Sequence, residues 1–206
     1  MDTMDTMDTM DTMDTIAMGV NASAKKEHWL MIDVSYVIFY RLYALLAWYR
    51  RAFKDGPCLG VTIADNSTQD DGTCKARTMF HNKLLDRVRA TLDDLNSAHS
   101  PDRVCLCFDG EQNWRKHYSA DYKGTRRHTE FMRTLFGACC SVMRSHSQSS
   151  SLAPPTSLLE HPELEADDTI HYIARECDIH RVSRVTIIAN DKDYVPLLRL
   201  PHVHIV

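Results

Sequence analysis

The sequence predicts an α/β fold, an open and mostly parallel sheet with helices on both faces. Short apolar runs that end in an acid recur along the chain, as is typical of strands buried on both faces of a parallel sheet. Longer segments with helical character lie between these runs, and the alternation indicates right-handed crossovers. With 44% hydrophobic residues, the 206-residue chain can form one substantial core.

The first half of the chain provides a strand and two helices. The run WLMID predicts a strand over residues 28–33, and the long apolar segment after it predicts a buried helix over 35–53, with Ser35 as its N-cap. A polar loop over 55–73 follows. The apolar residues at 76–96 recur with the 3.6-residue spacing of an amphipathic helix.

The second half continues the alternation. RVCLCFD and RVTIIAND are two further apolar runs that end in an acid. The Ser/Pro-rich stretch 146–157 cannot be helical throughout, so it is expected to be a connector. The expected strands here are 103–109, 158–161, 184–191 and 202–206, and the expected helices are 129–144, 165–177 and 193–200, the last interrupted by Pro196.

The start of the chain differs from the rest. Its first 15 residues are five copies of Met-Asp-Thr, which cannot bury apolar surface, so 1–27 is expected to be a disordered leader and 28–206 the folded core. The repeat carries five of the 28 acids, so the remainder has a formal net charge of +1 rather than −4. Charge-driven function therefore requires local segregation.

The composition predicts a soluble, intracellular protein. The chain lacks the roughly 18 consecutive apolar residues of a membrane span, and it lacks a secretory signal. No membrane contact is therefore expected. Its seven cysteines form no disulfide framework. Cys105 and Cys107 alternate within one expected strand, so they should point to one buried face rather than bind zinc.

Acidic residues gather at one edge of the expected sheet. Each alone is explained as a helix cap, but together they meet at the carboxyl ends of the strands, where such sheets bind ligands. Two like charges about 6 Å apart repel by about 3 kcal/mol at an effective dielectric constant near 20, so the cluster requires a cation. Its members are Asp33, Asp109, Glu165, Asp167, Asp168, Asp191 and Asp193.

The ligand chemistry of this cluster favours Mg²⁺ or Mn²⁺, because all the donors are carboxylate oxygens. Two such ions about 4 Å apart would activate a water molecule and stabilise the leaving oxygen when a phosphodiester is cleaved. The cofactor expected from the sequence is therefore a pair of divalent ions.

A basic segment, 114–127, follows Asp109 closely. Cations neutralise phosphates and aromatic rings stack on unpaired bases, so this mixture suits single-stranded nucleic acid. A solvated helix is the ordinary explanation of a charge run, but the position beside the acids favours the nucleic-acid role. The segment contains Arg115, Lys116, Lys123, Arg126 and Arg127, the rings of Trp114, Tyr118 and Tyr122, and one acid, Asp121.

Four ordered segments resemble the motifs of the 5′ nuclease superfamily, which includes flap endonucleases and 5′ to 3′ exonuclease domains. They are MID, FDGEQNWRKHYSADYKGTR, LEADDTIHYIARE and IIANDKDYVPLL, and the resemblance spans about residues 29–206. The large DNA virus and protist branch is the most similar. The resemblance implies a PIN-like core with a basic helical arch, and a metal-dependent, structure-specific 5′ nuclease that cuts DNA with a 5′ flap or a single-stranded end, in replication or repair.

The resemblance also implies a role for individual residues. Those implied for the first metal region are Asp33, Asp109, Glu165 and Asp167, with Asp168 matching the bacterial type of the motif, and those for the second are Asp191 and Asp193. Lys123 and Arg126 fall where the family places catalytic cations on the scissile phosphate, and Arg115 and Tyr122 where it steers the substrate. Phe39 or Tyr40 would stack on the terminal base, and the spacing does not decide which.

One departure from the family concerns the helix-hairpin-helix module that grips duplex DNA. No such motif occurs in the sequence, so the module is expected to be absent. Two alternatives stay open: a PIN-type ribonuclease acting on RNA, and a truncated, weakly catalytic remnant that binds nucleic acid. A monomer is expected. A sliding clamp is an alternative partner for which no motif is present, and the sequence does not distinguish the nucleus from a cytoplasmic replication site.

Overall fold

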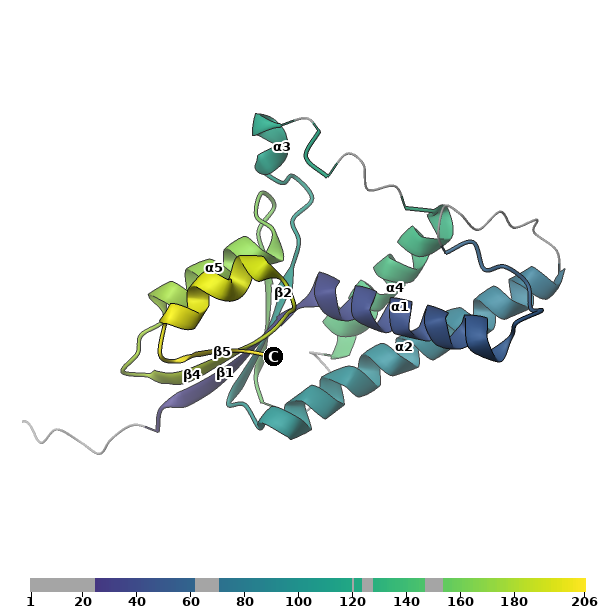
Figure 1. The fold of residues 1–206 in the computed structure, drawn as a ribbon. Helices are drawn as coiled ribbons and strands as arrows, with labels where there is room; N and C mark the ends of the chain where they lie inside the picture. Colours follow the sequence, from purple (N-terminus) through teal and green to yellow (C-terminus); the bar gives the residue numbers. More distant parts are fainter. Residues whose placement is uncertain (1–24, 62–70, 120, 124–127, 147–153) are drawn as a thin grey trace, which may run out of the picture.

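Among the residues that it describes, the computed structural model contains an open sheet of five parallel strands in the order β3-β2-β1-β4-β5 (Figure 1). This confirms the predicted α/β class. The strands are β1 (Glu27–Asp33), β2 (Arg103–Phe108), β3 (Thr156–Glu160), β4 (Val182–Ile188) and β5 (Val203–Ile205). The structure describes residues 25–61, 71–119, 121–123, 128–146 and 154–206.

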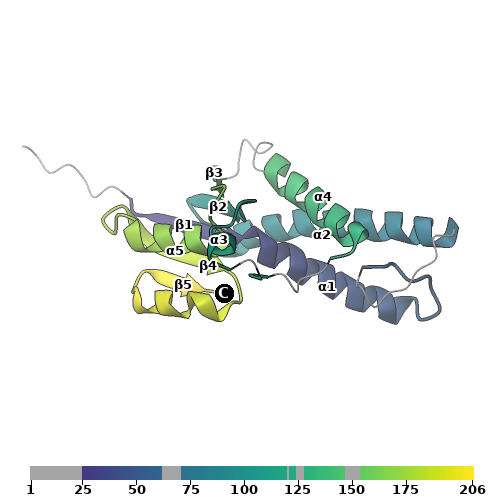
Figure 2. The same ribbon diagram turned by 90° about the horizontal axis from the view of Figure 1, so that it is seen from above.

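Helices cover both faces of the sheet. α1, α2 and α4 pack together on one face, whereas α5 and η1 cover the other (Figures 1 and 2). None of the helices in the described part of the chain has the length and apolarity that crossing a bilayer requires. The helices are α1 (Val34–Ala52), α2 (Asp71–His99), α3 (Arg115–Tyr118), α4 (Glu130–His146), α5 (Ala166–Glu176) and the 3₁₀ helix η1 (Lys192–Arg199).

The two cores follow from the alternation of side chains along the strands. Leu30 and Ile32 of β1 contact the core beneath α1, α2 and α4, whereas Met31 between them points to the core beneath α5 and η1. Cys105 and Cys107 both belong to the second core, which confirms their expected burial on one face. Burial raises the pKa of the Cys105 thiol to about 11.

Several element ends differ from the sequence-based expectation. α1 begins at Val34 because Asp33 rather than Ser35 is its N-cap, with Oδ1 accepting the Tyr36 N–H at 2.9 Å. The expected 55–73 loop is already helical at Asp71, and residues 62–70 lie outside the described part. The last helix is of the 3₁₀ type and contains Pro196, which has no N–H to donate.

The structure describes only residues 25–27 of the expected leader. β1 begins at Glu27, the final residue of the expected 1–27 segment, and residues 1–24 lie outside the description. The prediction of a disordered leader therefore stays a prediction.

The sheet order places the ends of three strands next to one another. Cys107 of β2 lies opposite Asp33 of β1, and Ile188 of β4 lies opposite Ile32. The chain leaves β2 and β4 on either side of Asp33, at the point where the strand order reverses. In open parallel sheets this switch point is where ligands bind.

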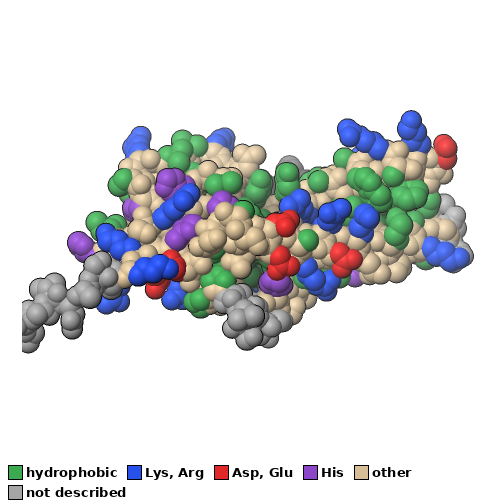
Figure 3. All heavy atoms as spheres, turned by 90° about the horizontal axis from the view of Figure 1, so that it is seen from below, with side chains coloured by type: hydrophobic (Ala, Val, Ile, Leu, Met, Phe, Trp, Pro, Cys, Tyr) green, Lys and Arg blue, Asp and Glu red, His purple; other side chains and the backbone are tan. Residues whose placement is uncertain are grey.

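The distribution of charge on the surface is uneven. The face seen from below carries Lys and Arg side chains interspersed with Asp and Glu, with a hydrophobic patch beside them (Figure 3). Charge on this face is therefore mixed. Acidic side chains gather instead at the carboxyl edge of the sheet.

Candidate active site

A hollow of about 340 Å³ opens at the carboxyl edge of the sheet. Its walls come from the end of β1, the start of α1, the segments that follow β2 and β4, and the start of α5. The structure thus brings together side chains from distant parts of the sequence. The predicted acids that line the hollow are Asp33, Asp109, Glu165, Asp167, Asp191 and Asp193.

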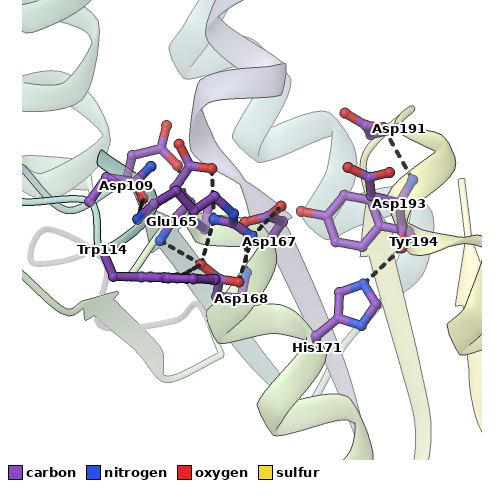
Figure 4. Close-up of polar contacts among 12 residues, drawn as sticks. Asp109, Trp114, Glu165, Asp167, Asp168, His171, Asp191, Asp193 and Tyr194 are labelled. Carbon is purple, nitrogen blue, oxygen red and sulfur yellow. Dashed lines mark hydrogen bonds and ion pairs between the residues drawn. The ribbon is translucent and has the colours of Figure 1, made fainter. Parts of the chain in front are cut away.

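Five of these six acids form two groups. Asp109, Glu165 and Asp167 lie on one side, and Asp191 and Asp193 lie on the other, with the Tyr194 ring between the groups (Figure 4). The division parallels the two metal regions that the family resemblance implies. The ligand roles themselves remain predictions.

Asp33 is held by two hydrogen bonds at the base of the hollow. Its Oδ1 accepts the Tyr36 N–H at 2.9 Å, and its Oδ2 accepts the Tyr194 hydroxyl at 3.0 Å. Burial raises the pKa of Asp33 to about 6, and the neighbouring Asp109 and Asp167 carboxylates act in the same direction, whereas the two hydrogen bonds act against it. A cation in the hollow would stabilise the charged form of Asp33 and so lower its pKa.

Tyr194 connects Asp33 to η1. Its ring is fully buried and stacks on His171 with centroids 5.7 Å apart, and His171 Nε2 lies 2.9 Å from the carbonyl oxygen of Asp193. Asp191 caps η1, because its Oδ1 accepts the Asp193 N–H at 3.1 Å. Sequence reasoning missed Tyr194, although an aromatic hydroxyl directly after the Asp-Lys-Asp turn was the available signal.

Asp109 joins three elements just beyond the end of β2. Its Oδ1 accepts the Ala166 N–H at the start of α5 at 2.9 Å, and its Oδ2 accepts the Ser35 hydroxyl from α1 at 2.5 Å. Ser35, expected as a helix cap, therefore serves the site instead.

Glu165 is the N-cap residue of α5 and is only 6% exposed. Three side chains of the basic segment converge on it. Oε2 accepts hydrogen bonds from Arg115 Nη1 and the Tyr122 hydroxyl, both at 2.9 Å, and Oε1 accepts one from Lys123 Nζ at 2.5 Å. The predicted proximity of the basic segment to the acids is therefore present in the structure.

Asp168 does not line the hollow, in contrast to the other predicted acids. Its two oxygens bind the Arg115 guanidinium, each at 2.7 Å, and Oδ2 also accepts the Trp114 indole N–H at 3.3 Å. Asp168 therefore lies outside this hollow, and the metal-ligand role that the family resemblance implies for it stays a prediction.

A larger hollow of about 620 Å³ adjoins the first. The residues that line both are Ser35, Phe39, Asp109, Tyr122, Lys123 and Glu165. Cationic and aromatic side chains from α3 and α4 complete its lining. The residues that line only the larger hollow include Lys116, His128, Arg133 and Phe136.

The two aromatic candidates on α1 differ in position. Phe39 lines both hollows, stacks on His128 at 5.9 Å and lies 5.3 Å from the Phe136 ring. Tyr40 is 56% exposed and lines neither. Arg126, the second predicted catalytic cation, lies outside the described residues.

The donor set fits a hard divalent ion, because carboxylate oxygens converge on one hollow. In the described ranges no three Asp, Glu, His or Cys side chains enclose an ion as they lie. Glu165 faces Arg115 and Lys123, and Asp33 faces Tyr194. Holding an ion therefore requires these carboxylates to exchange contacts within the protein for contacts with the metal.

A parallel α/β domain with a carboxylate-lined hollow at its switch point, next to a basic segment, defines a class of ligand-binding or catalytic domains that act at the carboxyl edge of the sheet. The chain belongs to the family of 5′-3′ exonuclease N-terminal resolvase-like domains, because the family model matches residues 28–206. This match confirms the family resemblance.

Two solved structures are similar to the chain. The T5 D15 protein co-crystallised with metal ions has a TM-score of 0.48 and 17% identity, over 86% of this chain and 53% of that one. A mutant of the T5 5′-exonuclease has a TM-score of 0.44 and 16% identity, over 87% and 49%. The chain thus spans about half the length of these two proteins. No curated protein sequence matches it.

Proposed function

We propose that the chain is a divalent-metal-dependent, structure-specific 5′ nuclease that hydrolyses phosphodiester bonds in DNA carrying a 5′ flap or a single-stranded end. The observation that carries this proposal is the hollow lined by six carboxylates, which adjoins a hollow lined by cations and aromatic rings. Membership of a 5′-3′ exonuclease domain family supports a nucleic-acid substrate.

The carboxylates would hold one ion between Asp33, Asp109, Glu165 and Asp167, and a second at Asp191 and Asp193. Bound ions of this kind supply an activated water and stabilise the leaving oxygen. The chain's own residues orient the ligands: Ser35 and the Ala166 N–H fix Asp109, while Tyr194 and the Tyr36 N–H fix Asp33.

The substrate side of the site follows from the second hollow. Lys123, which donates to Glu165 and lines both hollows, would neutralise a phosphate of the substrate. The family resemblance implies the same role for Arg126. Arg115 and Tyr122 would steer the strand. Of the two aromatic candidates, Phe39 has the position to stack on a terminal base, since it lines both hollows.

Cleavage of a labelled 5′-flap DNA tests the proposal. We expect cuts near the junction with Mg²⁺ or Mn²⁺, none with excess EDTA, and recovery when Mg²⁺ is restored. A matched RNA flap is offered in parallel, and preferential cleavage of RNA would favour the PIN-type ribonuclease instead. Binding without cleavage under all metal conditions would contradict the nuclease and favour a nucleic-acid-binding remnant.

Replacing Tyr194 by Phe should weaken metal binding. The substitution keeps the buried ring but removes the hydroxyl that donates to Asp33 Oδ2. Loss of one outer hydrogen bond to a ligand typically costs about tenfold in metal affinity, with about 1 kcal/mol in stability. Calorimetric titration with Mg²⁺ measures the affinity. Tyr172→Phe, which removes a hydroxyl from a ring that is 69% exposed on α5, is the matched control. Wild-type affinity in Tyr194→Phe would contradict the prediction.

A further inference from the structure

Asp168 was grouped with the metal ligands in the sequence, yet the structure gives its oxygens other partners. Oδ1 binds Arg115 Nη2, and Oδ2 accepts hydrogen bonds from Arg115 Nη1, the Trp114 indole and the Glu165 backbone N–H at 3.1 Å. The last of these bonds closes the capping box at the start of α5. Asp168 thus faces α3 and the N-terminus of its own helix, outside the hollow.

We infer that Asp168 is a positioning residue that anchors the base of the basic segment through Arg115 and Trp114. This inference rests on the proposed function, because it assigns a part to Asp168 in the same site. Arg115 and Asp168 form a bidentate salt bridge, the geometry that makes arginine–carboxylate contacts strong and directional. Their side chains are only 23% and 22% exposed, so solvent screens the pair less than a surface pair.

The contacts of Asp168 with Trp114 and Arg115 continue a set of backbone hydrogen bonds between the segment after β2 and the segment before α5. The segment that follows β2 runs beside 161–164, with hydrogen bonds from the N–H groups of Gly110, Gln112 and Trp114 to carbonyl oxygens at 2.7 to 2.9 Å. The last of these backbone bonds is made by Trp114, whose indole N–H also donates to the Asp168 side chain. The guanidinium of Arg115 lies 5.1 Å from the Trp114 ring and 5.9 Å from the Tyr122 ring, which extends the packing toward Lys123.

Arg115 also contacts two acids that line the hollow, Glu165 at 2.9 Å and Asp167 at 3.6 Å. Glu165 is a proposed metal ligand, so a partner for Arg115 outside the hollow keeps the guanidinium in place when Glu165 turns to a metal. Asp168 is that partner. It holds Arg115, and with it the start of α3, without occupying a position among the carboxylates that line the hollow.

The test compares Asp168→Asn with Asp167→Asn, its neighbour that lines the hollow. We expect Asp168→Asn to retain the Mg²⁺ affinity of the full chain within about threefold, whereas Asp167→Asn loses about tenfold or more. Asp168→Asn should also increase acrylamide quenching of the Trp114 fluorescence, a component identified by its loss in Trp114→Phe. In flap cleavage its effect should fall mainly on KM.

A charge-neutral control separates position from charge. Arg115→Met combined with Asp168→Asn removes one charge of each sign and leaves the net charge beside the hollow unchanged, so an increase in Trp114 quenching in this variant reports the lost anchor rather than a change in charge. A loss of Mg²⁺ affinity in Asp168→Asn equal to that in Asp167→Asn, or unchanged Trp114 quenching, overturns the inference. A wild-type chain that binds no Mg²⁺ and cuts no DNA contradicts the proposed function instead, and the quenching measurement still decides the role of Asp168.

Discussion

Asp109→Asn should reduce kcat/KM for Mg²⁺-dependent flap cleavage by about 100-fold or more while leaving the fold intact. The amide oxygen can still accept the Ala166 N–H, and the amide NH2 group, in the place of Oδ2, can donate to the Ser35 hydroxyl oxygen, so the links between β2, α1 and α5 persist. What disappears is the negative charge at the hollow, on which the affinity for a divalent ion depends. A factor of 100 corresponds to about 2.7 kcal/mol of transition-state stabilisation.

The measurement combines initial cleavage rates at several Mg²⁺ concentrations with thermal unfolding of the same preparations. Asp94→Asn is the matched control, because Asp94 is an exposed acid on α2 that lines neither hollow. We expect it to cleave like the wild type. If Asp109→Asn cleaved at the wild-type rate with an unchanged melting temperature, Asp109 would not belong to the catalytic site.

Gly110→Ala should destabilise the protein by about 3 kcal/mol, at the upper end of the usual cost of overpacking. A Cβ atom at this position would lie 2.0 Å from the His161 carbonyl oxygen and 2.4 Å from that of Pro162. Both are backbone atoms, so no side chain can rotate away. The segment after β2 would have to separate from the segment before α5, and the 2.8 Å bond from Gly110 N to Leu164 O would break.

Thermal unfolding followed by circular dichroism tests this prediction, with an expected fall in Tm of about 6 to 12 °C for a chain of this size. Gly137→Ala is a demanding control. A Cβ at Gly137 meets nothing within 4 Å, and the residue lies within α4, so alanine should stabilise the helix by about 1 kcal/mol. An equal Tm for Gly110→Ala and the wild type would show that the two segments are not packed as described.

The sequence was sufficient to predict the parallel sheet and the meeting of its terminal acids. Asp33 and Asp109 end adjacent strands, and the geometry of parallel strands alone brings such residues to one edge. The apolar runs identified the strands because both faces of the sheet are covered. All six acids that line the hollow are among those predicted from the sequence.

The errors arose where local rules compete with contacts between distant segments. The helix is expected to begin at Glu165, but Glu165 precedes it as the N-cap, and the capping box turns Asp168 back toward Arg115. Serine is a residue type that often caps helices, yet Asp33 is the N-cap of α1. The Ser35 hydroxyl therefore donates to Asp109 instead. The Tyr194 bond to Asp33 joins residues that no spacing rule connects.

The central position of β1 has a consequence for biosynthesis. β1 is complete at Asp33, but its partner β4 begins only at Val182, and the hydroxyl that holds Asp33 belongs to Tyr194. During translation β1 stays unpaired on one side until β4 has left the ribosome. Such distant pairing makes folding slow and leaves apolar strand edges exposed in the nascent polypeptide, which is where chaperones act.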